Sequence, residues 1–194
     1  MDFLIIKADA GYLPLKAGSV DLLLATPPYI GAKRLRKGDY CTNDRSQYRA
    51  FITSFLHEAT RILKPGGYLL MTPSRPPLKK HVGARFVKFN VLRKDPFDPD
   101  WIWNVIACKM YWTHFVGFES CWWAGRPSLY RDLLQCYSSA GDTVVHVFSG
   151  SGNSGIAALS LGRKPVMIDL HYHRHMLKRL RRYIRQHRPR VRLA

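Results

Sequence analysis

Residues 26–29, Thr26-Pro27-Pro28-Tyr29, combine groups that suit the recognition of a planar amine, and they directly follow the apolar run 20–25. Proline has no N–H and a fixed φ, so the Pro27-Pro28 backbone presents carbonyl acceptors in set positions. The Thr26 hydroxyl adds an acceptor, and the Tyr29 ring offers a face on which a base can stack. The pattern predicts an amine-binding pocket at the mouth of a strand, although an ordinary Pro-Pro turn would read the same locally.

A glycine-rich segment far downstream predicts a site for a nucleotide-like ligand. Residues 144–148 read as a strand, residues 149–155 read Ser-Gly-Ser-Gly-Asn-Ser-Gly, and residues 156–161 read as a helix. Glycines between a strand and a helix let the backbone approach a ligand closely. A second strand then ends at Asp169, where a carboxylate suits the ribose hydroxyls of a nucleotide.

These segments resemble the amino-methyltransferases, which use S-adenosylmethionine to methylate the exocyclic nitrogen of adenine or cytosine. Residues 26–29 are similar to the motif (Ser/Thr/Asp/Asn)-Pro-Pro-(Tyr/Phe/Trp), and residues 148–154 to the Phe-x-Gly-x-Gly cofactor motif. Asp169 matches the acid assigned to the ribose, Asp9 matches the acid near the cofactor's adenine, and residues 63–71 resemble a turn and central strand of such enzymes. With the Pro-Pro motif first and the cofactor turn last, the order resembles the circularly permuted, beta-type group of DNA amino-methyltransferases.

The resemblance, over roughly residues 5–75 and 120–185, implies two sets of site residues. The catalytic set is Thr26, Pro27, Pro28 and Tyr29. The cofactor-binding set is Asp9, Phe148, Ser149, Gly150, Ser151, Gly152, Asn153, Ser154 and Asp169.

The implied reaction begins when the target base leaves its stack and packs on Tyr29. The Thr26 hydroxyl and the Pro27 carbonyl would accept hydrogen bonds from its amine, and the nitrogen would attack the sulfonium methyl. The Thr26 hydroxyl is similar to the serine of cytosine N4 enzymes. Cytosine N4 in DNA is therefore the expected target, with adenine N6 as the alternative.

Three departures from the family pattern bear on the cofactor. The family usually has Asp-Pro-Phe where this chain has His146-Val147-Phe148, and a histidine there is expected to weaken cofactor binding or make it pH-dependent. Asn153 and Ser154 replace two threonines and keep their hydrogen-bonding capacity. Arg126 stands in a degenerate Lys-Pro segment, where it supplies a charge for the cofactor's carboxylate or lies on the surface.

The charge predicts a polyanionic partner, because 31 Lys and Arg face 13 Asp and Glu, for a formal net charge of +18. Such a chain attracts nucleic acid in a salt-dependent way. Basic residues group at 33–37, 75–88 and 178–192, and each group is either a solvated face or a contact to nucleic acid. For the loop after the predicted pocket we expect phosphate contact by Lys33, Arg34, Arg36 and Lys37.

The alternation of elements predicts an α/β fold. It is expected to be a Rossmann-like S-adenosylmethionine-dependent methyltransferase fold with a mostly parallel sheet, helices on both faces and a circularly permuted motif order. Strands are expected near 3–7, 20–25, 68–72, 143–147 and 165–169, and helices near 46–62, 127–138, 153–161 and 171–186.

The chain is expected to form a single methyltransferase domain over 1–194. The catalytic half covers about 1–75, an irregular basic segment about 76–100, the cofactor-binding half about 120–186 and a basic tail 187–194. The spacing between the two halves leaves no room for a large independent recognition domain.

Four cysteines without CxxC spacing predict neither a metal site nor a disulfide framework, and they favour a reducing, cytoplasmic setting. No membrane segment is expected. DNA is the expected partner, RNA is the alternative, and a homodimer is one way to read DNA without a recognition domain. Two rivals are an RNA amino-methyltransferase and a nucleic-acid-binding protein on a degenerate methyltransferase fold.

Overall fold

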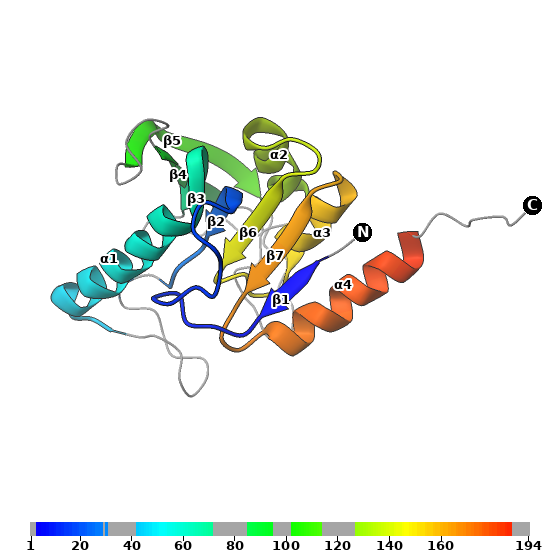
Figure 1. Cartoon of the computed structure of the whole chain (residues 1–194), viewed down its shortest axis with the longest axis horizontal. Coiled ribbons are helices and arrows are strands. Elements are labelled where there is room, and N and C mark those ends of the chain that lie inside the picture. The colour runs from blue at the N-terminus through cyan, green and yellow to red at the C-terminus, as the bar shows by residue number, and fades with distance from the viewer. Residues whose placement is uncertain are drawn as a thin grey trace, which may run out of the picture.

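The computed structural model of the chain describes residues 3–28, 30, 42–71, 85–94, 102–113 and 127–187. Within these ranges one sheet has the strand order β1-β7-β6-β2-β3-β4-β5 (Figure 1). The strands are β1 (Leu4–Ile6), β2 (Val20–Ala25), β3 (Leu63–Met71), β4 (Arg85–Lys94), β5 (Ile102–Thr113), β6 (Thr143–Val147) and β7 (Lys164–Ile168). The helices are α1 (Arg45–Ile62), α2 (Pro127–Tyr137), α3 (Asn153–Ser160) and α4 (His173–His187).

The five strands β1, β7, β6, β2 and β3 run parallel, and β4 and β5 extend the sheet antiparallel beyond β3. Strand β2 lies between β6 and β3, and its residues are buried except for the half-buried Asp21. The carboxyl ends of the parallel strands therefore lie along the same side of the sheet, here called its carboxyl edge, and β2 lies near the middle of it. In open α/β sheets this edge is where ligands bind.

Helices cover both faces of the sheet (Figure 1). Because successive side chains of a strand point to opposite faces, Leu23 and Val145 join the core under α1 with Phe55 and Ile62. Leu22 and Val144 join a second core under α2 and α3, and α4 packs on β7 through a third cluster that contains Met167, Met176 and Leu180. This arrangement confirms the predicted fold class, a mostly parallel sheet with helices on both faces.

Most predicted elements match the structure to within two residues, but two predictions were wrong. The segment 76–100 was expected to be irregular, yet Arg85–Lys94 forms β4. Its sequence, Arg-Phe-Val-Lys-Phe-Asn-Val-Leu-Arg-Lys, is rich in residues that favour strands, and it is paired on both sides, with β3 and β5. Strand β3 was expected to begin at residue 68 but begins at Leu63, which pairs with Val20 of β2. The register then shifts, and pairing resumes between Tyr68 and Leu22.

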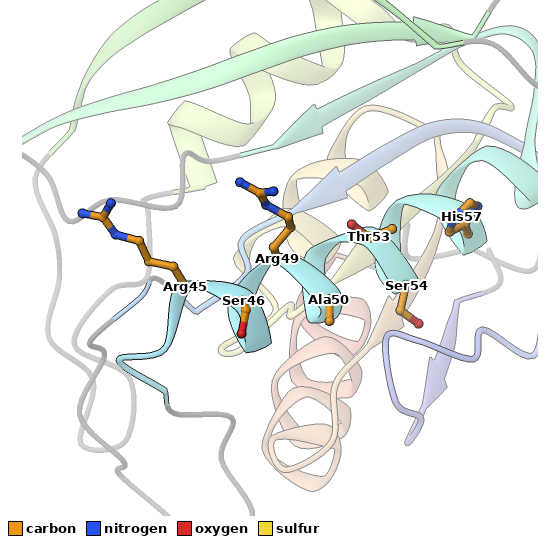
Figure 2. Close-up of a pocket in the computed structure, with 7 residues that line it drawn as sticks. All are labelled: Arg45, Ser46, Arg49, Ala50, Thr53, Ser54 and His57. Carbon is orange, nitrogen blue, oxygen red and sulfur yellow. The ribbon is translucent and has the colours of Figure 1, made fainter.

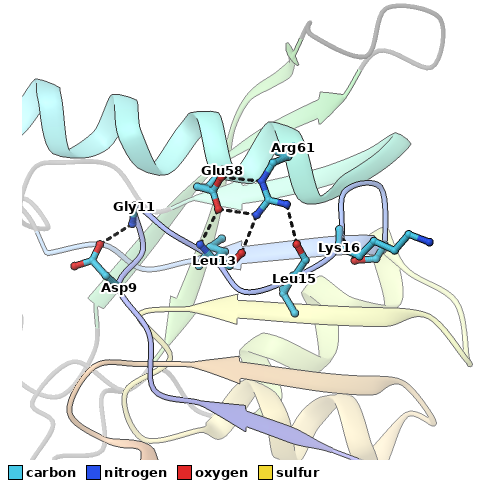
Figure 3. A network of polar contacts seen from close by, with 8 residues as sticks. Asp9, Gly11, Leu13, Leu15, Lys16, Glu58 and Arg61 are labelled. Atoms are coloured by element: carbon cyan, nitrogen blue, oxygen red, sulfur yellow. Dashed lines mark hydrogen bonds and ion pairs between the residues drawn. The ribbon is translucent and has the colours of Figure 1, made fainter.

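The loop between β1 and β2 is anchored on α1 by a polar network (Figure 3). Glu58 accepts a hydrogen bond from the Leu13 N–H at 2.7 Å and forms an ion pair with Arg61 at 2.7 Å. Arg61 also donates to the Leu13 and Leu15 carbonyls at 2.7 and 2.8 Å. The hydrogen bond from Arg61 lowers the pKa of Glu58, so the pair stays charged and ties this loop to the helix.

Across the described ranges, no helix is both long and apolar enough to cross a membrane.

Candidate active site

The predicted site residues meet at the carboxyl edge of the sheet. Thr26 follows β2, Asp9 follows β1, residues 148–152 follow β6 and Asp169 follows β7. Backbone hydrogen bonds continue between the strand ends: Thr26 N–H donates to the Val147 carbonyl at 3.3 Å, and Asp169 N–H to the Ile6 carbonyl at 3.2 Å. Segments more than a hundred residues apart in the sequence therefore form one surface.

The turn after β6 has an unusual backbone. Phe148, Gly150 and Gly152 have positive φ angles of 62°, 52° and 78°, a region that favours glycine and costs roughly 1–3 kcal/mol for other residues. The Phe148 ring packs at 5.8 and 5.6 Å, centroid to centroid, from Phe51 and Phe55 of α1. This packing holds Phe148 in its strained conformation, and the turn leads straight into α3 with Gly152 as its N-cap.

Asp169 organises both the glycine-rich turn and the start of the next loop. Its Oδ2 accepts a hydrogen bond from the Gly150 N–H at 2.9 Å, and its Oδ1 accepts from the N–H groups of His171 and Tyr172 at 2.9 and 3.0 Å. A carboxylate has about four lone-pair sites, so these three bonds leave acceptor capacity for a ligand hydroxyl. Asp9 is exposed on the same edge, and its Oδ1 accepts from the Gly11 N–H at 2.7 Å.

A buried histidine links the β2 and β6 ends. His146, 1% exposed, places Nε2 3.2 Å from Thr26 Oγ1 and Nδ1 2.6 Å from Ser154 Oγ. The Thr26 hydroxyl also lies 2.8 Å from the Phe148 carbonyl oxygen. A carbonyl only accepts, so the Thr26 hydrogen must point to Phe148.

The remaining hydrogens follow from that assignment. Because the Thr26 hydroxyl hydrogen is bonded to Phe148, the Thr26 oxygen can only accept in its hydrogen bond with His146. His146 must therefore donate from Nε2. Burial lowers the pKa of His146 from 6.5 to about 3, so the ring is neutral and Nδ1 accepts from the Ser154 hydroxyl. The chain of hydrogen bonds thus runs from Ser154 through His146 and Thr26 to Phe148, and it leaves one lone pair of the Thr26 oxygen for another donor.

This geometry changes the interpretation of His146. The histidine was expected to alter cofactor binding or its pH dependence. That effect on the cofactor stays a prediction. In the structure the ring faces the Thr26 hydroxyl and lies 5.6 Å from the Tyr130 ring, centroid to centroid, and burial keeps it uncharged near neutral pH.

Several side chains of the predicted cofactor-binding set are occupied by protein partners. Ser149 donates to the Ile168 carbonyl at 3.0 Å, and Ser154 is bonded to His146. Asn153 accepts from Arg179 through Oδ1 at 2.7 Å, and Ser151 is buried. What this turn offers a ligand is therefore chiefly its backbone and its close approach.

Sequence reasoning missed two residues that shape the site. Tyr48 of α1 donates its hydroxyl to the Pro28 carbonyl at 3.0 Å and so holds the Pro-Pro segment. Arg179 of α4 donates to the Ser151 carbonyl at 2.6 Å, although it was expected within a basic group that faces solvent or nucleic acid. The local signal was its position on the apolar stripe of the helix, because Met176, Arg179, Leu180 and Tyr183 follow the spacing i, i+3, i+4 and i+7.

Other predicted contacts lie outside the described residues, namely Tyr29, Lys33, Arg34, Arg36, Lys37 and Arg126. Most of the basic tail also lies outside them.

The sequence matches no protein-family model and no curated protein. Solved structures of similar fold exist. One is a protein of Thermus thermophilus whose name suggests a DNA modification methylase. It is 16% identical to this chain, with a TM-score of 0.61 over 97% of this chain and 96% of its own. The cytosine-N4-specific PvuII DNA methyltransferase is 12% identical, with a TM-score of 0.55 over 88% and 82% of the two chains.

A third similar structure, the complex of M1.HpyAVI with S-adenosylmethionine, is 15% identical, with a TM-score of 0.56 over 92% of this chain and 98% of its own. At these identities the likeness is one of fold. The chain has the Rossmann-like fold seen in S-adenosylmethionine-dependent methyltransferases.

Proposed function

We propose that this protein transfers a methyl group from S-adenosylmethionine to the exocyclic amino group of a base in DNA, with cytosine N4 as the preferred target. One observation carries the proposal: Thr26 Oγ1 is held as a hydrogen-bond acceptor at the carboxyl end of β2. An amine that approaches it finds an oxygen whose hydrogen already points to Phe148, 2.8 Å away.

The residues beside Thr26 fit the cofactor. The turn with positive φ at Phe148, Gly150 and Gly152 brings backbone close to a ligand, and Asp169 retains acceptor capacity for ribose hydroxyls. Asp9 is an exposed carboxylate on the same edge, suited to the adenine amino group. The cofactor would supply a methyl group on a positive sulfonium, which is electrophilic without further activation.

Support for the cofactor also comes from the similar structures. The Thermus thermophilus protein was crystallised in complex with S-adenosylmethionine, as was M1.HpyAVI.

The chain's own residues would bind and orient the base. Thr26 Oγ1 accepts one amine hydrogen, and a backbone carbonyl of the Pro-Pro segment accepts the other. Pro27 has the more available of the two carbonyls, because the Pro28 carbonyl already accepts one hydrogen bond, from Tyr48. Two acceptors on one amine draw it away from planarity and free its lone pair, and holding it in position supplies most of the remaining effect.

The choice of base and polymer rests on three observations. Position 26 carries a hydroxyl, like the serine of cytosine N4 enzymes, whereas by the family resemblance adenine enzymes more often carry a carboxylate or an amide there. PvuII DNA methyltransferase, which has a similar fold, is cytosine-N4-specific. The net charge of +18 favours a nucleic acid over a small amine.

The test uses two substitutions at one position. Thr26→Val removes the acceptor and keeps the branched shape, whereas Thr26→Ser keeps the hydroxyl. Labelled S-adenosylmethionine is incubated with unmethylated duplex DNA and with bulk RNA, and the product nucleosides are identified. We expect N4-methylcytosine in DNA, with the rate reduced about 100-fold in Thr26→Val, the order found when one polar group is removed from an active site, and largely kept in Thr26→Ser.

Other products would redirect the proposal. N6-methyladenine would overturn the choice of base, and label in RNA alone would overturn the choice of polymer. No transfer to either polymer, with nucleic-acid binding intact, would mean that the chain is a binding protein on this fold.

A further inference from the structure

The outer face of α1 carries a groove of about 790 Å³ that no part of the proposed reaction uses (Figure 2). Its lining includes Arg45, Ser46, Arg49, Thr53, Ser54 and His57. Arg45, Arg49, Thr53 and His57 follow one another at four-residue spacing, so they form a single exposed stripe along the helix. The groove therefore combines cationic groups with hydroxyl groups.

No carboxylate of the described residues lines this groove. The two acids nearest to it in sequence are already engaged. Asp44, the N-cap of α1, accepts from the Ser46 N–H and hydroxyl at 2.7 and 2.8 Å. Glu58 is paired with Arg61 at 2.7 Å. Among the described residues no acid is therefore paired with Arg45 or Arg49, and both guanidinium groups are exposed to an external anion.

The opposite side of the same helix forms a wall of the candidate site. Tyr48, between Arg45 and Arg49 in sequence, reaches the Pro28 carbonyl at 3.0 Å. Phe51 packs 5.8 Å from Phe148, centroid to centroid. A strand whose base entered the pocket beside Thr26 would therefore leave it close to the first turns of α1.

We propose that the α1 groove binds the phosphate backbone of the strand whose base enters the site, an inference that rests on the proposed function. The stripe from Arg45 to His57 is about 18 Å long at 1.5 Å per residue. One strand of B-form DNA carries a phosphate about every 3.4 Å along the axis, and its phosphates lie farther apart along the winding backbone, so the stripe spans at most about five phosphates. Guanidinium and hydroxyl groups are the usual partners of phosphate oxygens. Such contacts add affinity and register but carry no base sequence.

A second cationic surface provides a matched control. Helix α4 exposes Arg174, Lys178, Arg181, Arg182 and Arg185, and it packs on the other face of the sheet from α1. The double variants R45A/R49A and R181A/R185A each remove two exposed arginines at four-residue spacing. Each double variant lowers the formal net charge of +18 by two. A loss of DNA affinity that reflects only the overall charge is therefore equal in both.

The measurement is binding of a fluorescent DNA duplex, followed by anisotropy from low to moderate salt. Each phosphate contact adds about 0.9 to the slope of log K against log salt. We expect R45A/R49A to reduce that slope by about 1.8 and R181A/R185A to leave it near the wild-type value. R45K/R49K should retain the slope because both positive charges remain. Thermal unfolding is measured for each variant to check that it is folded. A parallel arm with an RNA hairpin tells which polymer supplies the phosphates.

An equal loss in both double variants, or a larger loss in R181A/R185A, overturns the assignment of the groove. Binding and methyl transfer are measured separately, so the two proposals can fail independently. If the wild type binds through the groove but transfers no methyl group, the proposed function fails and the groove remains only as a phosphate-binding surface, without a link to a base in the site. If the wild type methylates DNA and R45A/R49A keeps the full slope, only the groove fails.

Discussion

The buried ring of His146 should make the folded protein sensitive to acid. The ring is neutral in the folded protein because burial lowers its pKa from 6.5 to about 3. In the unfolded chain it takes up a proton as the pH falls below 6.5. Its contribution to stability is therefore fully present above that value and is lost progressively as the pH falls toward 3.

The size of the effect follows from the pKa difference. A pH of about 5 lies roughly 1.5 units below the unfolded value, and each unit corresponds to about 1.36 kcal/mol. We therefore expect His146 alone to lower the free energy of unfolding by about 2 kcal/mol between pH 8 and pH 5. That is a large share of the roughly 5–15 kcal/mol that stabilises an ordinary domain.

Urea unfolding at both pH values tests this for the wild type, His146→Gln and His146→Asn. Neither replacement can take up a proton, so both variants should lose about 2 kcal/mol less than the wild type. His57→Gln, at an exposed position on α1, is the matched control and should behave as the wild type. Nitrogen NMR of the wild-type His146 ring gives a second reading if a variant does not fold, with Nε2 protonated and Nδ1 bare.

Two results would refute the reasoning. The first is an equal pH dependence in the wild type and both His146 variants. The second is a wild-type ring that carries its hydrogen on Nδ1 or gains a second hydrogen between pH 8 and 5, because Thr26 would then not be held as an acceptor by a neutral histidine.

Three further outcomes are expected. In methyl-transfer assays the rate of His146→Gln should exceed the rate of His146→Asn by about tenfold, the effect of one hydrogen bond. The longer Gln side chain can place its amide nitrogen where Nε2 of the histidine lies, and equal rates in the two variants would contradict the role of this donor. Gly152→Ala should lower the free energy of unfolding by about 1–3 kcal/mol, because φ is +78° and the new Cβ would lie 3.0 Å from Met176 Cγ; an unchanged urea midpoint would argue against this. Asp169→Asn should weaken S-adenosylmethionine binding about tenfold in calorimetry, since a charged acceptor is lost, whereas Asp142→Asn, in the loop before β6, should not; equal effects would remove the specific role of Asp169.

The sequence alone was enough to predict the fold class and the motifs that the structure gathers at the carboxyl edge of the sheet. Apolar runs of strand length alternate with helical segments, and each run ends in a polar or glycine-rich motif, at Thr26, at Gly150 and at Asp169. Parallel strands place their carboxyl ends together, so motifs at strand ends must meet. Strands β4 and β5 were missed, because the Pro, Lys and Asp residues of the segment 76–100 were given more weight than the strand-favouring residues of 85–94.

What the side chains at that edge do was decided by the tertiary structure. Thr26 and His146 are 120 residues apart in the chain, and no local pattern shows that they touch or that Ser154 completes the chain of hydrogen bonds. The same holds for Tyr48 on the Pro28 carbonyl and Arg179 on the glycine-rich turn. Periodicity and turn propensity act over a few neighbouring residues, whereas the donor, acceptor and charge state of a buried group depend on which distant residues surround it.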